Sequence, residues 1–330
     1  MKKITSILLL FVFTLSLLTS CGISNNDTTN EGNKSKIRIG TLSGPTGMGI
    51  AKMISDNGFD SDKYSFTVFG DPVSAQDAFI AGDLDAICFP TNNAAKLYAK
   101  TNGQLYVTAI NCLGSLYVIS SKNVTINSIQ DLEGKTIYAS VPNSTTGAII
   151  EYILKENNIN ANVSFALGGE ELTSHDLLAT RIGEGKIDIA ILPEPKATAT
   201  ILANPTLGLS IDLNLSAEWE KVSESTEPLT MGCIIFSKKF VDNNKNSVDA
   251  FLTEYNASIS FINDKANLES AAEMIVSAGI LPKVPLAKKA LNNLYGSIVY
   301  IEGSAMKNAL KSFYTVINEN QPDDNFYYER

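Results

Sequence analysis

The chain has 330 residues, with 26 Lys or Arg against 35 Asp or Glu, and a formal net charge of −9 at pH 7. An acidic exterior of this kind argues against a nucleic-acid partner, because phosphate backbones bind basic surfaces. The length is sufficient for one large or two medium-sized domains with substantial cores.

The first residues have the features of an export signal. A basic start is followed by an apolar run over 7–18, and then by Leu18-Thr19-Ser20-Cys21. A transmembrane anchor is the weaker alternative, because it needs ~20 apolar residues and this run is shorter. We therefore interpret 1–20 as a signal peptide. The stretch 24–35 has no apolar residue, so 21–35 is predicted to be a flexible tether.

The folded part is predicted to begin with a strand over 37–41, followed by a loop rich in Gly, Pro and hydroxyl residues and by a helix. At a helix start several backbone N–H groups lack a partner and the helix dipole is positive, which suits a polar or anionic ligand. The candidate ligand-binding residues of this loop are Ser43, Gly44, Pro45, Thr46, Gly47 and Met48. Because the loop is expected to line a cleft, Thr46→Arg or Gly47→Val should block ligand without unfolding the chain.

Strands and helices then alternate along the chain. Strands are predicted over 64–69, 85–89 and 105–110, and helices are predicted to start near Asp71 and near Thr91. This alternation with short loops predicts a parallel sheet with helices on both of its faces.

The same arrangement occurs a second time. The segment 136–148 is again a strand, a loop and a helix start, and Thr146-Gly147 repeats Thr46-Gly47. Further along each copy, the segment 185–193 is similar to 82–90, and both segments end in Pro. Two similar lobes are the simplest explanation of such a repeat.

A single cleft is expected to collect the polar residues at the ends of these strands. Open α/β sheets bind ligands beyond the carboxyl ends of their strands. From the first lobe this predicts Thr91 and Asn92 as further ligand-binding residues. From the second lobe it predicts Asn143, Ser144, Thr145, Thr146 and Glu194.

Two further matching stretches lie on either side of the second copy. Both 114–120 and 232–237 are apolar runs that start with Gly and end with Ser. They are either two crossings between the lobes or two ordinary buried strands. With crossings, lobe I comprises 36–113 and 232–330, lobe II comprises 114–231, and the ligand closes a clamp between them.

The sequence offers little for catalysis or metal binding. Nucleophilic catalysis needs a base beside an activated residue, and His175 is the only histidine. The loop spacing G-x-x-G-x-G differs from that of dinucleotide-binding loops. Cys88, Cys112 and Cys233 lie in apolar runs, which indicates small buried side chains, although a Cys112–Cys233 bridge stays open. No catalytic residue, metal or cofactor is therefore predicted.

Several of these motifs together resemble a known family. They are Cys21 in its lipobox, 44–49 (GPTGMG), 131–136 (DLEGKT), 187–195 (IDIAILPEP) and 231–233 (MGC). They are similar to those of substrate-binding lipoproteins of ABC importers, the nitrate/sulfonate/taurine type, which includes binders of thiamine pyrimidine precursors. The resemblance supports Ser43, Thr46 and Thr91 as pocket residues.

The resemblance implies a two-lobed type II periplasmic-binding-protein fold of the α/β class and a monomeric, non-enzymatic receptor. Such a receptor is held outside the cytoplasm at the cell membrane by a lipid on Cys21, commonly with palmitate. It passes a small polar solute to a permease that is driven by an ATPase. The alternatives are an enzyme on the same fold, such as a pyrimidine-precursor synthase, and a lipoprotein that senses a ligand. The sequence does not name the ligand.

Overall fold

The structure is a computed structural model that describes residues 35–142, 144–222, 227–317 and 320–330. Lys34–Arg330 form one compact unit. The predicted signal peptide, the lipobox residue Cys21 and nearly all of the tether lie outside the described residues. Within these residues, no helix combines the length and the apolar character that are needed to cross a bilayer.

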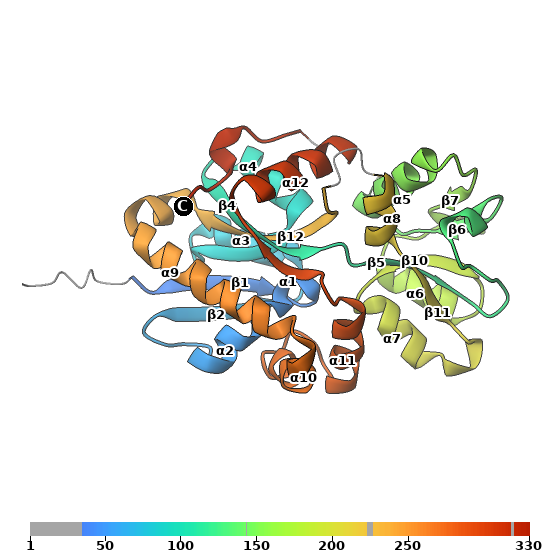
Figure 1. Ribbon diagram of the computed structural model, residues 1–330, viewed down its shortest axis with the longest axis horizontal. Helices are drawn as coiled ribbons and strands as arrows, with labels where there is room; N and C mark the ends of the chain where they lie inside the picture. Colours follow the sequence, from blue (N-terminus) through green and yellow to red (C-terminus); the bar gives the residue numbers. More distant parts are fainter. Residues whose placement is uncertain (1–34, 143, 223–226, 318–319) are drawn as a thin grey trace, which may run out of the picture. The chain divides into compact units, whose positions relative to one another are not determined.

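The first sheet has six strands in the order β13-β4-β12-β3-β1-β2 (Figure 1). Its strands are β1 (Ile37–Leu42), β2 (Tyr64–Phe69), β3 (Ala86–Pro90), β4 (Leu105–Leu113), β12 (Thr230–Ser237) and β13 (Ile298–Ile301). β1 pairs in parallel with both β2 and β3, in agreement with two successive strand-helix-strand units.

The second sheet has five strands in the order β11-β5-β10-β6-β7. Its strands are β5 (Leu116–Ser120), β6 (Thr136–Tyr138), β7 (Asn162–Ser164), β10 (Ile189–Pro193) and β11 (Ser210–Asn214). A separate hairpin is formed by β8 (Ala166–Leu167) and β9 (Glu170–Glu171).

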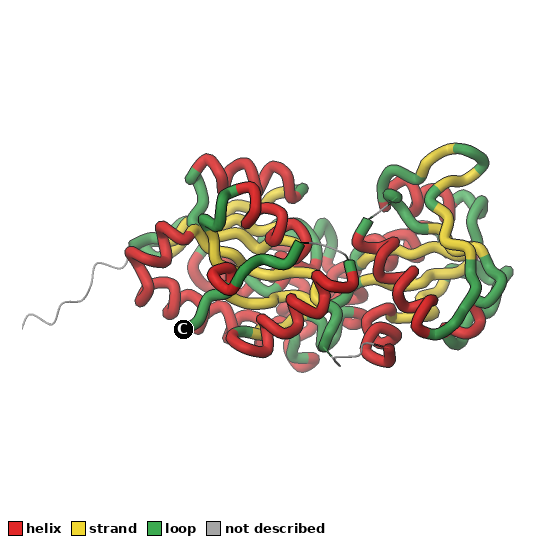
Figure 2. Tube along the Cα trace, turned by 90° about the horizontal axis from the view of Figure 1, so that it is seen from above, coloured by secondary structure: helices red, strands yellow, loops and turns green. Residues whose placement is uncertain are grey.

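Helices lie on both faces of each sheet (Figures 1 and 2). They are α1 (Pro45–Met48), α2 (Ala51–Asn57), α3 (Pro72–Ala81), α4 (Thr91–Lys100), α5 (Thr145–Glu156), α6 (His175–Gly183), α7 (Lys196–Ala203), α8 (Leu215–Val222), α9 (Lys238–Ile262), α10 (Leu268–Ser277), α11 (Val284–Asn293) and α12 (Gly303–Val316). Short 3₁₀ helices span Ile129–Leu132, Pro205–Leu207, Lys265–Asn267 and Asp324–Phe326.

Successive residues of a strand point to opposite faces of its sheet, and the core is divided accordingly. One cluster packs α2, α9, α10 and α11 on one face of the first sheet. A second cluster packs α3, α4 and α12 on the other face and continues to α5 and α8 on the second sheet. A third lies between the second sheet, α6 and α7. α4 and α5 therefore share one continuous core.

The prediction of a parallel sheet is confirmed for β1, β2 and β3, but neither sheet is parallel throughout. β12 runs antiparallel to β3 and β4, and β5 runs antiparallel to β10 and β11. The reason is that the chain leaves the first sheet at the end of β4, passes through Gly114-Ser115 and enters β5. It returns after α8, partly through residues outside the described ranges, so β12 enters the first sheet from the edge at which β4 ends. The predicted division into lobes at 113/114 and 231/232 stays a prediction.

The local signals of the sequence act as expected at several element ends. Asp71 caps α3, and its carboxylate accepts a hydrogen bond from the Ser74 N–H at 2.9 Å. Gly82 ends α3 with a φ of 81°, a conformation that favours glycine. Among the described residues, Cys88, Cys112 and Cys233 are free and buried. The open alternative of a Cys112–Cys233 bridge is thus not realised, and the three act as small core side chains.

Candidate functional site

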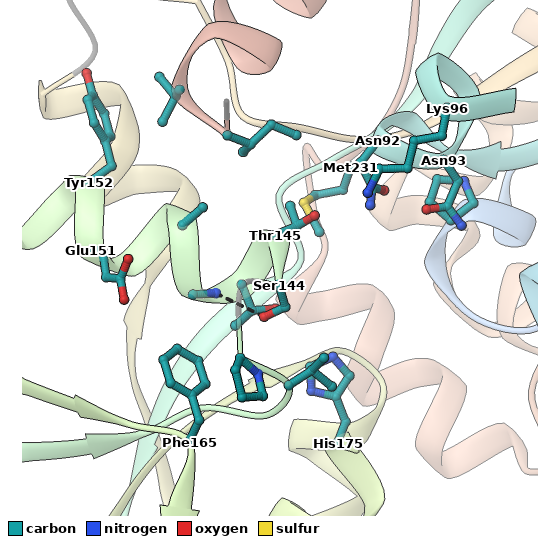
Figure 3. A pocket seen from close by; sticks show the side chains of 18 of the residues that line it. Asn92, Asn93, Lys96, Ser144, Thr145, Glu151, Tyr152, Phe165, His175 and Met231 are labelled. Atoms are coloured by element: carbon teal, nitrogen blue, oxygen red, sulfur yellow. Dashed lines mark hydrogen bonds between the residues drawn. The ribbon is translucent and has the colours of Figure 1, made fainter. Parts of the chain in front are cut away.

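A cavity of about 1080 Å³ lies where three helices begin (Figure 3). Its described lining consists of Pro90, Asn92, Asn93, Lys96, Val141, Pro142, Ser144, Thr145, Thr146, Gly147, Ala148, Glu151, Tyr152, Lys155, Phe165, His175, Met231, Val316 and Ile317. The first turns of α4 and α5 and the first residue of α6 contribute to it. The positive ends of three helix dipoles therefore meet at one cavity.

The start of α5 is the best-defined polar part of the cavity. Ser144 is the N-cap, and its Oγ accepts a hydrogen bond from the Gly147 N–H at 3.2 Å while it donates one to the Ser140 carbonyl at 3.1 Å. α5 carries no acidic residue in its first turn. The unpaired N–H groups and the dipole at this end are therefore available to an anion.

The start of α4 lies on the other side of the cavity (Figure 3). Asn92 and Asn93 lie in its first turn and Lys96 one turn later, and all three line the cavity. The first turn of α4 also lacks an acidic residue. This wall supplies amide donors and an ammonium group, which favours a negatively charged ligand.

His175 adds a ring nitrogen at the start of α6. Its Nδ1 lies 2.7 Å from Ser140 Oγ, in a hydrogen bond whose direction depends on the tautomer. Burial lowers the pKa of the His175 imidazole from its ordinary value, Asp176 raises it and Lys196 lowers it, with a net downward shift. At neutral pH the ring is therefore neutral, and it can offer one nitrogen to Ser140 and the other to a ligand.

Apolar side chains also contribute to the lining. Tyr152, Phe165, Met231, Val316 and Ile317 line the cavity, and the Tyr152 ring packs against Trp219 with 5.1 Å between ring centroids. Among the cavity residues on α5, Glu151 and Lys155 add one charge of each sign. A ligand of this cavity would thus meet both helix starts and apolar side chains.

Some of the predicted residues come together here. Asn92, Ser144, Thr145 and Thr146 all line the cavity, and the repeat in the sequence did place the α5 residues at a helix start. Asn143 lies outside the described residues. Sequence analysis did not select Lys96, Phe165, Met231 or the end of α12. It also gave no binding role to His175, the single histidine of the chain.

The first loop, Ser43–Met48, does not contribute to the lining of this cavity. Ser43 is exposed and its Oγ donates to the Phe69 carbonyl at 3.3 Å. The Thr46 carbonyl accepts from Asn111 Nδ2 at 3.1 Å. A Cβ added at Gly232 would lie 3.0 Å from Thr46 Cγ2, so the loop lies beside the residue that follows Met231. The predicted ligand contacts of Ser43, Gly44, Pro45, Thr46, Gly47 and Met48 stay predictions.

Thr91 and Glu194 are engaged elsewhere. Thr91 is buried, and its Oγ1 donates to the Thr230 carbonyl at 3.0 Å. Glu194 is 2% exposed and bonded to Thr198 and Asn293. Neither contributes to the cavity lining, and their predicted ligand contacts remain untested.

Comparison with known proteins gives a consistent result. The sequence model of one family, described as ABC transporter, phosphonate, periplasmic substrate-binding protein, matches residues 61–278. Among curated proteins, no significant match is found.

Solved structures of ABC transport components share the fold at low identity. An ABC transporter protein from Parabacteroides distasonis matches with a TM-score of 0.71 and 18% identity, over 90% of this chain and 99% of that one. The periplasmic aliphatic sulphonate binding protein from Escherichia coli gives 0.66 and 13%, over 89% and 92%. A ligand-binding component of an import system from Staphylococcus aureus, solved with zinc bound, gives 0.64 and 14%, over 89% and 96%.

The structure thus combines two helix-covered sheets with three helix starts around one cavity. The family match covers more than half of the chain, so the chain belongs to the phosphonate-type periplasmic substrate-binding proteins of ABC transporters. Proteins of this kind bind a small ligand outside the cytoplasm and work with a permease and an ATPase. Among the described residues, no group of three or more His, Cys, Asp or Glu side chains could hold a metal ion.

Proposed function

We propose that the protein binds a small organic anion of the phosphonate or sulfonate class and delivers it to an ABC permease for import. The observation that carries this proposal is the meeting of the starts of α4 and α5 at one cavity, with no acidic residue in either first turn. Each helix start presents unpaired N–H groups and a positive dipole end. Lys96 on α4 adds a formal positive charge to the lining.

The apolar part of the lining supports an organic rather than an inorganic anion. Tyr152 and Phe165 lie on the α5 side of the cavity and Met231 lies near Asn92 on the α4 side (Figure 3), while Val316 and Ile317 also line the cavity. Nitrate or inorganic phosphate would leave this surface in contact with water, whereas an alkyl group would cover it at a gain of about 25 cal/mol per Å². The phosphonate family and the sulphonate-binding neighbour agree with this choice.

The proposed contact residues are those that combine the sequence prediction with the cavity lining, namely Asn92, Ser144, Thr145 and Thr146, together with the adjoining lining residue Gly147. Backbone N–H groups of α5 would hold the anionic oxygens, and the amide of Asn92 would reach them from α4. The receptor is proposed to act as a monomer, with no covalent step.

Isothermal titration tests this function. The chain comprising 36–330 should bind n-propylphosphonate or propanesulfonate, because the anion replaces water at the helix starts. Dimethyl propylphosphonate, the neutral ester with the same propyl group, is the matched control and should bind at least about 100-fold more weakly, as expected for loss of a charge in a partly buried site. Equal affinity for the ester, or no binding of either anion, would contradict the proposal.

We further propose that a lipid on Cys21 holds the receptor at the membrane, since Cys21 ends the apolar signal and begins the polar tether. The full-length chain should fractionate with membranes and incorporate labelled palmitate, and Cys21→Ala should do neither. A Cys21→Ala chain that still takes up palmitate would contradict this anchor.

A further inference from the structure

A buried carboxylate outside the cavity joins two parts of the compact unit: the first half, which contains the first sheet and its helices, and the second half, which contains the second sheet and its helices. Glu194 directly follows β10 of the second sheet and is 2% exposed. Its Oε1 accepts hydrogen bonds from Thr198 Oγ1 at 2.7 Å and from Asn293 Nδ2 at 2.6 Å, and its Oε2 accepts from the Thr198 N–H at 3.3 Å. Thr198 lies on α7, which covers the second sheet, whereas Asn293 comes from the other half.

Asn293 is the last residue of α11, a helix that packs in the same core cluster as α2, α9 and α10 on the first sheet. Besides its bond to Glu194, its Nδ2 lies 3.0 Å from Thr198 Oγ1. Its main-chain carbonyl accepts a hydrogen bond from Tyr117 Oη on β5 at 2.7 Å. One residue from the first half is thus bonded to a strand, a strand end and a helix of the second half.

Loss of the hydrogen bonds that Asn293 makes with Glu194 and Tyr117 would be energetically costly. A buried carboxylate is costly unless donors surround it, and Asn293 supplies one of the three donors to Glu194. Burial raises the pKa of Glu194, and the hydrogen bonds from Thr198 and Asn293 oppose that rise. If α11 moved away, Glu194 would keep only the donors of Thr198, and Tyr117, which is 2% exposed, would lose its acceptor.

We infer that Asn293 is a positioning residue that fixes the two halves relative to each other through Glu194 and Tyr117. The cavity takes α4 from the first half and α5 and α6 from the second, so this contact acts with the core cluster shared by α4 and α5 to set the separation between the helix starts. Asn293 does not line the cavity. The inference concerns the ligand-free protein, and it stands or falls independently of which solute binds.

Electron spin resonance on doubly labelled protein tests this inference. Ala99→Cys on α4 and Glu156→Cys on α5 place labels at exposed positions outside the cavity lining, while the three native cysteines of the described chain are buried. We expect a narrow label-to-label distance distribution in the parent chain. Asn293→Ala should broaden it about twofold, because more than one arrangement of the halves becomes populated. Asn292→Ala, at the exposed neighbour, should leave it unchanged.

Exchanging the carboxylate and the amide between positions 194 and 293 distinguishes a positioning role of Asn293 from a general loss of stability. Glu194→Gln and Asn293→Asp should each broaden the distribution, whereas the double variant again has one amide and one carboxylate facing each other and should restore the narrow form. This double variant also tests the positioning role of Asn293 if Asn293→Ala does not fold. An unchanged distribution in Asn293→Ala, or a double variant as broad as the single ones, would overturn the inference.

Discussion

Thr145→Asp is expected to weaken binding of n-propylphosphonate about 100-fold, since a carboxylate ~5 Å from the anion at an effective dielectric constant of ~20 costs ~3 kcal/mol. Thr145 is the first residue of α5 and lines the cavity. The same carboxylate is favourable for the helix itself, because a negative charge in the first turn interacts with the positive end of the helix dipole and stabilises the helix by about 0.3–1 kcal/mol. Affinity should therefore fall while the unfolding temperature stays equal or rises.

Because affinity and stability are expected to change in opposite directions, the variant distinguishes a loss of ligand binding from a loss of folding. Titration calorimetry gives the affinity and thermal unfolding gives the stability of the same samples. Thr145→Asn is the matched control, because it has nearly the same size without a charge and should cost far less affinity. Unchanged affinity in Thr145→Asp would place the anion away from the start of α5.

Gly47→Ala is expected to destabilise the protein by about 3 kcal/mol, as overpacking against backbone does. A Cβ at Gly47 would lie 1.9 Å from the Leu42 carbonyl oxygen and 2.9 Å from Thr41 Oγ1. The Leu42 carbonyl belongs to the end of β1 and cannot rotate away as a side chain would. The main chain between β1 and α1 must therefore shift.

Thermal unfolding measures this effect, with a fall of the unfolding temperature by roughly 5 °C as the expected result. Gly70→Ala is the matched control, because a Cβ there meets no atom within 4 Å. Equal unfolding temperatures in the two variants would mean that β1 and α1 have freedom that the structure does not show. The same contacts argue against the sequence-based expectation that Gly47→Val leaves the fold intact, because any Cβ at this buried glycine meets the end of β1.

Strand positions could be predicted well from the sequence, because buried strands leave a strong local signal. The prediction over 64–69 coincides with β2, whose apolar residues alternate, and the apolar run before Pro90 coincides closely with β3. Strand order could not be predicted in this way. β12 lies between β3 and β4 because of hydrogen bonds between residues far apart in sequence, and no local pattern encodes them.

The residues of the candidate site likewise differ in how well local sequence predicts them. The repeat in the sequence locates the start of α5, and the order of elements locates Asn92, since both depend on neighbours along the chain. The side-chain directions of Thr91 and Glu194 depend instead on Thr230 and Asn293, which are distant in sequence. Lys96 and Met231 reach the cavity from elements whose spatial arrangement only the tertiary structure supplies.

The position of a bound anion tests the central claim most directly. A crystal structure of the chain comprising 36–330 with n-propylphosphonate should show the phosphonate oxygens within hydrogen-bond distance of backbone N–H groups in the first turn of α5. The propyl group should lie toward Phe165 and Tyr152. An anion held at another place in the protein, with the first turn of α5 left to solvent, would contradict the account.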